Sequence, residues 1–522
     1  MPPAEPSERT RLGLSILAAA VALGAMGDML LRALPWGVNA SLSIGALVLA
    51  AALLVRRHRV PLGADASWLA LTALLLGAAF VRRDSEGLQF FDLVALCGVL
   101  ALTLLVASGR SLRDRAVMEY VVAAVLAVGH AAIGGLRLVF GDIRWSDVRL
   151  GGRMRTAKGV AIGTLLAAPL LIVFGALFAS ADVIFADVLD GMLAFEPRQI
   201  VGHVMLAGFL GYLAAGYFTG MLLRAQPGSG TDLTLVPNIT MPSLGIIPAA
   251  TALGLVNLLF LLFVVVQLRY LFGGQAMVFE TTGLTLAEYA RGGFFELVTV
   301  SGLVLPLLLA TDGLLRDADG AARRTFRNLA GLLLVLLGVV MTSALERMRL
   351  YVAEFGLSED RLYATAFMGY LAILFSWFAW TVLRDRRRRF AFGGLVQGLA
   401  VLAGLHLLNP DALIARVNVD RARESGRFDA AYLATHLSAD AVPVLVERLP
   451  SLPRAQACEV AQRLLERWTA TERDDWRSWN WSRHQARRLV SQQEPQLRAL
   501  ACDPTGGNES HRDNGPTTRR SS

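Results

Sequence analysis

Long apolar stretches, separated by short polar segments, recur along the chain from about Leu12 to Leu408. Val38–Val55, Pro248–Leu271 and Asn328–Ala344 are clear examples. A helix needs about 20 mostly apolar residues to cross ~30 Å of hydrocarbon, and lipid offers no hydrogen-bond partner to an open backbone. The pattern therefore predicts an all-α fold: a polytopic transmembrane helix bundle followed by a small helical extramembrane tail.

The apolar pattern divides into about twelve predicted spans. They are Leu12–Leu34, Val38–Val55, Trp68–Val81, Phe90–Ala107, Val117–Ile133, Val160–Phe178, Gly202–Leu223, Pro248–Leu271, Gly292–Ala310, Asn328–Ala344, Ala364–Leu383 and Phe390–Leu408. Trp68–Val81 is short, and Val117–Ile133 is interrupted by Glu119 and His130. The number of spans is therefore roughly ten to thirteen.

Helix-breaking residues suggest where the chain divides. The segment between Arg224 and Ile247 predicts a loop, because it contains the helix breakers Pro227, Gly228, Gly230, Pro237 and Pro242. The expected domains are an N-terminal membrane half (1–223), a linker (224–247), a C-terminal membrane half (248–408), a helical tail (409–502) and a disordered end (503–522).

The tail differs in character from the spans. Apolar residues at helical spacing, such as Leu433, Leu437 and Leu445, predict short amphipathic helices. Trp476, Trp479 and Trp481 stand among arginines. They fit either a segment held on the membrane surface or the core of a small helical domain.

Composition supports a membrane protein and argues against several functions. The chain is 54% hydrophobic and 18% charged, against about 25% charged residues in a typical soluble domain. Its net charge of +8 rests on arginine, since Lys158 is the only lysine. Because these arginines cluster at span ends, they indicate contact with the lipid bilayer and do not predict a nucleic-acid partner.

The arginines also suggest an orientation. If the spans alternate, Arg137–Lys158, Arg316–Arg327 and Arg384–Arg389 share one side, which should be cytoplasmic. The tail would then lie outside the cytoplasm. Arg56–Arg59 and Arg110–Arg115 contradict this assignment, and one misassigned span in the N-terminal half would remove the conflict.

Other sequence signals of chemistry are weak. Cys97, Cys458 and Cys502 give no disulfide framework, and unpaired thiols are favoured over pairing of the last two. Phosphate loops, nucleophile elbows, dinucleotide fingerprints and metal-ligand spacings do not occur. The sequence therefore predicts neither a cofactor nor a metal, and it contains no catalytic motif.

Two similar stretches are the best candidates for a functional site. Gly283–Arg291 and Gly356–Ala364 each carry helix-start signals, with Thr285 and Ser358 as predicted caps. Two spans separate them, so both should emerge on the face from which the tail leaves. The candidate cluster built from their ionisable and aromatic residues is Glu288, Tyr289, Arg291, Glu296, Glu346, Arg349, Tyr351 and Arg361. It is either a substrate or ion site or a set of charges that pair to hold span ends together.

Several of these segments carry a family resemblance. Leu286–Leu297, Arg347–Tyr351, Asn409–Asp411 and Asp440–Pro443 resemble the motifs of an uncharacterised bacterial membrane family, domain of unknown function 4173, and of its relative 4153. The resemblance implies a multi-pass protein of the bacterial inner (plasma) membrane. It implies no reaction, substrate or partner.

Three classes of function fit these observations. A transporter or channel is favoured by the number of spans and the ionisable residues within them. A membrane sensor or assembly factor would bind a protein partner through the helical tail. A membrane-embedded enzyme acting on lipid or polymer precursors would use the acidic residues at one face.

Overall fold

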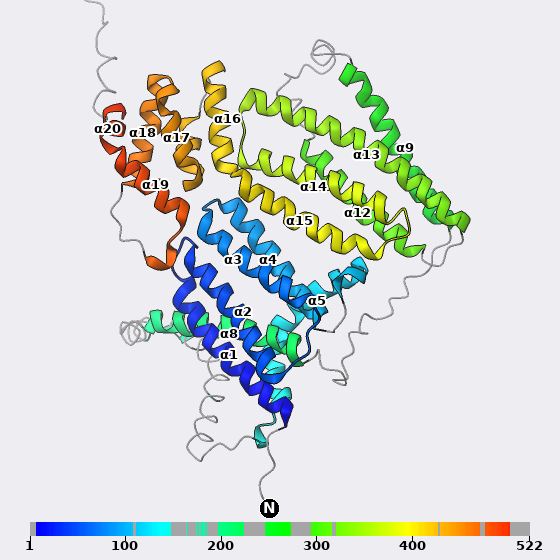
Figure 1. Ribbon diagram of the computed structural model, residues 1–522, viewed down its shortest axis with the longest axis vertical. Coiled ribbons are helices and arrows are strands. Elements are labelled where there is room, and N and C mark those ends of the chain that lie inside the picture. Colours follow the sequence, from blue (N-terminus) through cyan, green and yellow to red (C-terminus); the bar gives the residue numbers. More distant parts are fainter. Residues whose placement is uncertain are drawn as a thin grey trace, which may run out of the picture. The chain divides into compact units, whose positions relative to one another are not determined.

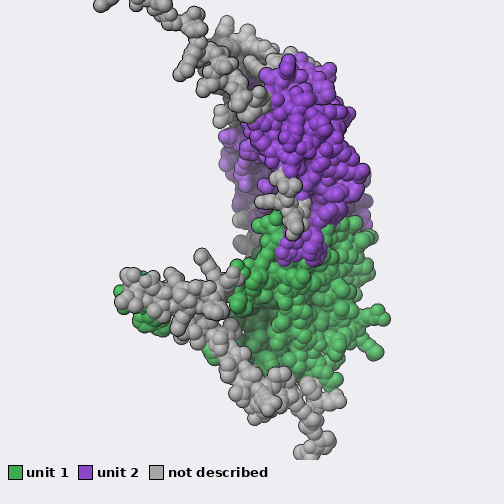
Figure 2. All heavy atoms as spheres, turned by 90° about the vertical axis from the view of Figure 1, so that its left-hand side faces the viewer, with its two compact units in different colours: residues 1–78, 93–239 green, residues 79–92, 240–522 purple. Residues whose placement is uncertain are grey.

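The computed structural model describes residues 7–107, 111–147, 197–223, 246–272, 294–315, 320–425, 429–469 and 475–501, with a few isolated residues between 163 and 185. Within these ranges every regular element is a helix (Figure 1). The chain forms two compact units, coloured separately in Figure 2. Unit 1 comprises residues 1–78 and 93–239, and unit 2 comprises residues 79–92 and 240–522. The short segment 79–92 therefore folds with the C-terminal part of the chain.

The described helices match the predicted spans closely. They are α1 (Glu8–Leu31), α2 (Val38–His58), α3 (Ala66–Arg82), α4 (Glu86–Val106), α5 (Val117–Arg137), α8 (Pro197–Phe218), α9 (Ile246–Phe272), α12 (Phe294–Leu314), α13 (Gly320–Phe355), α14 (Glu359–Thr381) and α15 (Arg388–Leu408). Within the described ranges, ten stretches are long and apolar enough to cross a membrane, and α3 is a shorter apolar helix. The predicted all-α bundle is confirmed. The predicted span Val160–Phe178 and the linker 224–247 fall largely outside the described residues.

Unit 1 is built around close contacts between α1 and α8. A Cβ atom added to Gly211 would lie 2.9 Å from the carbonyl oxygen of Ala20, so glycine lets the two backbones approach. Nearby, the guanidinium of Arg32 donates to Asp28 at 2.7 Å, as their spacing of four residues suggests, and the same carboxylate lies 2.5 Å from His203. These contacts fix the register of the two helices.

The two ends of α5 lie at the same end of unit 1. Just before α5, Arg115 donates to the carbonyl of Leu105, in the last turn of α4, at 3.0 Å. Just after α5, Asp142 accepts from Arg9 at the start of α1, at 2.7 Å. Two further contacts place other helix ends here. His58 at the end of α2 lies 3.0 Å from Ser15 near the start of α1, and the amide of Gly63, before α3, donates to the carbonyl of Val106 at the end of α4 at 3.2 Å.

The residues after Leu408 fold into a helical domain within unit 2. Its helices are α16 (Pro410–Ser425), α17 (Val442–Arg448), α18 (Arg454–Trp468), α19 (Trp481–Gln492) and α20 (Glu494–Leu500). They share a core that includes the fully buried Ile414, Val460 and Leu464, and Leu362 of α14 belongs to the same core. The predicted helical tail is thus a packed domain seated on a span.

The tryptophans of this domain divide into two groups. Trp468 is buried in the domain core, whereas Trp476, Trp479 and Trp481 are 58%, 38% and 51% exposed. The exposed rings argue against the helical-core interpretation of this segment. Next to them, Asn480 bonds to the carbonyls of Phe80 and Arg83 at the end of α3, so these rings lie beside the end of an apolar helix.

Arginines gather at the opposite ends of the spans of unit 2. Arg323 at the start of α13 pairs with Asp385, after α14, at 2.7 Å, and Arg327 contacts the same carboxylate. Arg387, before α15, reaches Asp312 in α12 at 3.4 Å. The basic loops therefore lie at one end of α13, α14 and α15, and the helical domain lies at the other end.

Candidate functional site

The predicted cluster does not form a single site among the described residues. Glu288, Tyr289 and Arg291 lie outside them. Glu296 is exposed in the first turn of α12. Glu346 and Arg349 form an exposed pair at 3.4 Å on α13. Only a cation–π contact is more enclosed: the Arg361 guanidinium lies 4.0 Å from the centre of the Tyr351 ring.

The helix start that depended on Ser358 has a different cap. As predicted, α14 begins immediately after Ser358, but the Ser358 side chain makes no capping hydrogen bond. Instead, the amide of Glu359 donates to the hydroxyl of Tyr432 in the helical domain, at 3.1 Å. The prediction of Ser358 as a side-chain cap was wrong, and the free amide that does have an outside partner bonds to a distant tyrosine.

A second group of polar residues is far more buried. It joins the turn between α3 and α4, the start of α14, the start of α16 and the α19 region. We call it the junction cluster, and its members are Arg83, Asp84, Ser85, Glu359, Asp411, Ser438, Asp440, Ser482 and Arg483. All of them belong to unit 2.

Asp411 is the most enclosed carboxyl of this cluster. It is 0% exposed and accepts from the amide of Ser438 at 3.1 Å, from the Ser438 hydroxyl, and from Ser85 at 3.4 Å. Glu359, at the start of α14, is an acidic neighbour of this carboxyl. Burial raises the pKa of Asp411, and the negative charge of Asp440 raises it further.

Asp440 and Asp84 join the helical domain to the α3–α4 turn reciprocally. Asp440 accepts from the Arg83 guanidinium at 2.9 Å and from the amide of Asp84 at 2.8 Å. In return, Asp84 accepts from the amide of Ala439 at 3.2 Å and from the Arg483 guanidinium. Burial raises the pKa of Asp84 despite its pairing with Arg483. Each partner thus satisfies backbone amides of the other.

The same contacts close the free carbonyl groups at the ends of three spans. Asn480 donates to the carbonyl of Phe80 in α3 at 2.8 Å, and Arg83 donates to that of His406 in α15 at 2.6 Å. Arg421 donates to that of Ala353 in α13 at 3.0 Å. The last carbonyls of a helix have no partner within it, so these side chains supply partners from outside. The helical domain is therefore bonded directly to span ends.

A small polar cavity lies beside the cluster. Its volume is about 100 Å³, and its walls include Arg83, Asp440, Trp481, Ser482 and Gln485. Such a space can hold several water molecules, since each needs about 10–15 Å³ by this measure. The cavity therefore has room for water beside the cluster. Among the residues that the structure describes, no group of three or more histidine, cysteine, aspartate or glutamate side chains is arranged to hold a metal ion.

Local sequence signals could not find this cluster. Asp411 follows a proline directly after a span, which is also what an ordinary helix start looks like. Asp84 sits in a three-residue polar turn, 356 residues from Asp440. One sequence signal did point to the cluster: Asp411 and Asp440 lie in the segments that resemble the family. The resemblance assigned no function to either residue.

Comparison with known proteins agrees with that signal. The family model described as Domain of unknown function (DUF4153) matches residues 70–448. This range contains Asp84, Glu359, Asp411 and Asp440 but not Arg483. No curated protein and no solved structure matches the chain. The resemblance named domain 4173 first and 4153 as its relative, and the match is to 4153. The chain, with its many apolar helices, belongs to the DUF4153 family, whose function is unknown.

Proposed function

We propose that this protein is a sensor or regulator of a bacterial plasma membrane. Its helical domain lies outside the cytoplasm. The strength with which this domain binds the span ends changes with the protonation of the junction cluster. The observation that carries this proposal is the fully buried carboxyl group of Asp411, which accepts hydrogen bonds from Ser438 and Ser85 and, among the described residues, has no ion-pair partner. A sensor needs an element whose state depends on its surroundings, and a buried carboxyl group at a domain junction is such an element, because it can gain or lose a proton.

The charges of the cluster support proton binding. The carboxylates of Asp84 and Asp440 pair with the guanidinium groups of Arg483 and Arg83. A third guanidinium nearby, of Arg467, donates to backbone carbonyl groups instead. Among the described residues, Asp411 and Glu359 remain without an ion pair to a guanidinium group. In a buried site the remaining pair is stable only while it holds a proton, because two neighbouring negative charges repel strongly there.

Each unit by itself supports the proposed orientation. In unit 2, the arginine pairs with Asp385 and Asp312 lie at the span ends away from the helical domain. In unit 1, Arg9 and the arginines that end α2 and precede α5 meet at one end. The cytoplasmic side collects arginine, so both ends are assigned to the cytoplasm. The helical domain is then extracytoplasmic.

When every predicted span crosses the membrane, Arg56–Arg59 and Arg110–Arg115 fall on the wrong side. This conflict disappears if α5 lies along the membrane surface. Its ends share one level of unit 1, whereas a crossing helix has its ends on opposite sides. Val121, Val125 and Val128 expose an apolar stripe, as expected of a helix resting on hydrocarbon. With α5 removed from the spans, Arg56–Arg59, Arg110–Arg115 and the segment after Arg137 share the cytoplasmic side.

The cysteines also support an external helical domain. Cys458 of α18 is disulfide-bonded, whereas Cys97 is free and exposed. The expectation of unpaired thiols was therefore wrong for Cys458. Disulfides persist in oxidising compartments outside the cytoplasm.

Labelling of single cysteines in intact cells tests this orientation. Ala455 of the helical domain and Ala321 at the start of α13 are both exposed alanines, so each can be replaced by cysteine without loss of packing. A membrane-impermeant maleimide should label Ala455→Cys in intact cells and label Ala321→Cys only after permeabilisation. The reverse pattern would overturn the proposed orientation.

The pKa shifts predict how the docking of the helical domain on the span ends should respond to pH. The pKa values of Asp411 and Asp84 are raised in the docked state. The docked state therefore binds more protons than the undocked state. Its stability is complete below the ordinary pKa of an aspartate and is lost as the pH rises through the raised value. The helical domain should bind the span ends more tightly at low pH than at high pH.

Hydrogen–deuterium exchange of the full-length protein in detergent can measure this response. Peptides covering Leu405–Asn418 should exchange faster at about pH 8 than at about pH 5, after correction for chemical exchange. Asp411→Asn, which cannot ionise, should exchange more slowly than wild type at the higher pH. Comparing the variant with wild type at the same pH removes the pH dependence of the intrinsic exchange rate. Asp420→Asn, on the same helix but half exposed, is the control. If Asp411→Asn matched wild type at both pH values, the proposal would fail.

One observation favours a transporter as the second candidate. His406 of α15 lies 2.9 Å from Asp92 of α4, and Asp92 is 1% exposed within an apolar helix. Ionisable residues inside spans often mark ion or proton paths. This pair lies at the domain end of both helices, next to the carbonyl that Arg83 caps. It therefore also fits a sensor whose signal continues into the spans.

A further inference from the structure

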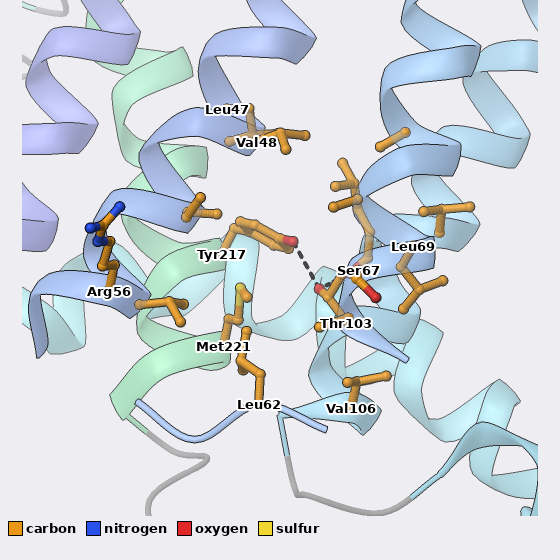
Figure 3. A pocket seen from close by; sticks show the side chains of 18 residues that line it. Leu47, Val48, Arg56, Leu62, Ser67, Leu69, Thr103, Val106, Tyr217 and Met221 are labelled. Atoms are coloured by element: carbon orange, nitrogen blue, oxygen red, sulfur yellow. Dashed lines mark hydrogen bonds between the residues drawn. The ribbon is translucent and has the colours of Figure 1, made fainter. Parts of the chain in front are cut away.

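An apolar cavity lies within unit 1. It has a volume of about 300 Å³ and lies between α2, α3, α4 and α8 (Figure 3). This size is at the lower limit of ordinary ligand pockets. The hydroxyl groups of Tyr217 and Thr103 in its wall bond to each other at 2.8 Å, so neither needs a polar ligand. The interior therefore suits a hydrocarbon.

The length of the cavity matches one leaflet of a bilayer. Its wall on α2 runs from Leu47 to Arg56, which is about 14 Å at 1.5 Å per residue. The hydrocarbon layer of a bilayer is about 30 Å thick, so one leaflet is about half of that. Figure 3 shows Leu47 and Val48 at one end of the cavity and Leu62 and Val106 at the other.

A positive charge marks the rim. The stem of Arg56 lines the wall, and its guanidinium lies outside the apolar interior (Figure 3). Within the described part of the chain, Arg56 makes no hydrogen bond or ion pair. The exposed Arg57 and Arg59 follow it at the end of α2. Guanidinium groups bind phosphate through charge-assisted hydrogen bonds, and basic pockets between spans bind anionic lipid headgroups.

We infer that this cavity holds one acyl chain of an anionic phospholipid, whose headgroup is bound by Arg56. Apolar walls, a depth of one leaflet and an unpaired cation at the rim together match the two parts of such a lipid. Anionic lipids are abundant in the cytoplasmic leaflet. The inference does not depend on the junction cluster and remains open to test if the proposed sensor role fails.

Native mass spectrometry of the full-length protein, released from detergent with added phosphatidylglycerol or phosphatidylethanolamine, tests this inference. Wild type should retain one phosphatidylglycerol molecule in preference to phosphatidylethanolamine. Arg56→Gln should weaken that retention about tenfold, because one charge-assisted contact is lost. Arg57→Gln, an adjacent exposed arginine that does not line the cavity, should have little effect. Ala70→Trp fills the cavity and should abolish retention of both lipids.

The other outcomes contradict the inference in distinct ways. Equal retention of both lipids, unchanged in Arg56→Gln, would exclude the anionic headgroup and leave a general apolar cavity. Undiminished retention in a folded Ala70→Trp protein would exclude the cavity itself. If Ala70→Trp fails to elute as a single species, Arg56→Gln still decides, because Arg56 is exposed and its replacement leaves the packing of unit 1 intact.

Discussion

Replacing Arg83 by glutamine is expected to lower the free energy of unfolding of unit 2 by about 3–5 kcal/mol, the cost of leaving a buried charge without its partner. The Asp440 side chain is 1% exposed and the Arg83 side chain 12% exposed, so water can replace little of the lost interaction. The same change frees the carbonyl of His406 at the end of α15. Thermal unfolding of the purified full-length protein in detergent should show a large decrease in Tm.

Two variants show whether the pairing with Asp440 causes this loss. Arg82→Gln changes the adjacent arginine, which is exposed, and should have little effect on Tm. Asp440→Asn removes the charge that Arg83 compensates, so Arg83→Gln combined with Asp440→Asn should cost less than the sum of the single changes. Strict additivity would mean that Arg83 acts through its carbonyl contact alone.

The spans could be predicted from sequence because contact with lipid imposes a one-dimensional rule. A helix surrounded by hydrocarbon must be apolar along its whole length, so Pro248–Leu271 and Asn328–Ala344 could be recognised without knowing their neighbours. The pairing of Asp28 with Arg32 followed from helical spacing in the same way. Such signals lie within one element.

The junction cluster could not be predicted because its contacts join distant segments. Asp84 and Asp440 satisfy each other's backbone, yet nothing in either segment specifies the other. The predicted cluster used local capping signals instead, and these located the start of α14 but not its true cap, Tyr432. The placement of both ends of α5 at one end of unit 1 could not be predicted either, because it depends on contacts of those ends with α4 and α1.

The turn between α13 and α14 carries the second large expected effect. Gly356 ends α13 with φ +82°, a left-handed conformation that costs a residue with a Cβ atom about 1–2 kcal/mol. A Cβ atom at this position would also collide with the side-chain amide of Asn418. That amide accepts from the Leu357 amide at 3.0 Å and donates to the Leu357 carbonyl at 2.6 Å, which joins α16 to the turn.

Gly356→Ala should therefore destabilise unit 2 by about 3–4 kcal/mol, from the backbone strain and the loss of two hydrogen bonds of about 1 kcal/mol each. Gly369→Ala, in the middle of α14 with open space around it, is the matched control and should be neutral or slightly stabilising. In an Asn418→Ala background the collision is absent, so Gly356→Ala should there cost only the strain of about 1–2 kcal/mol. Comparison of the four Tm values separates strain from collision, and an equal loss in both backgrounds would show that Asn418 does not hold α16 to this turn.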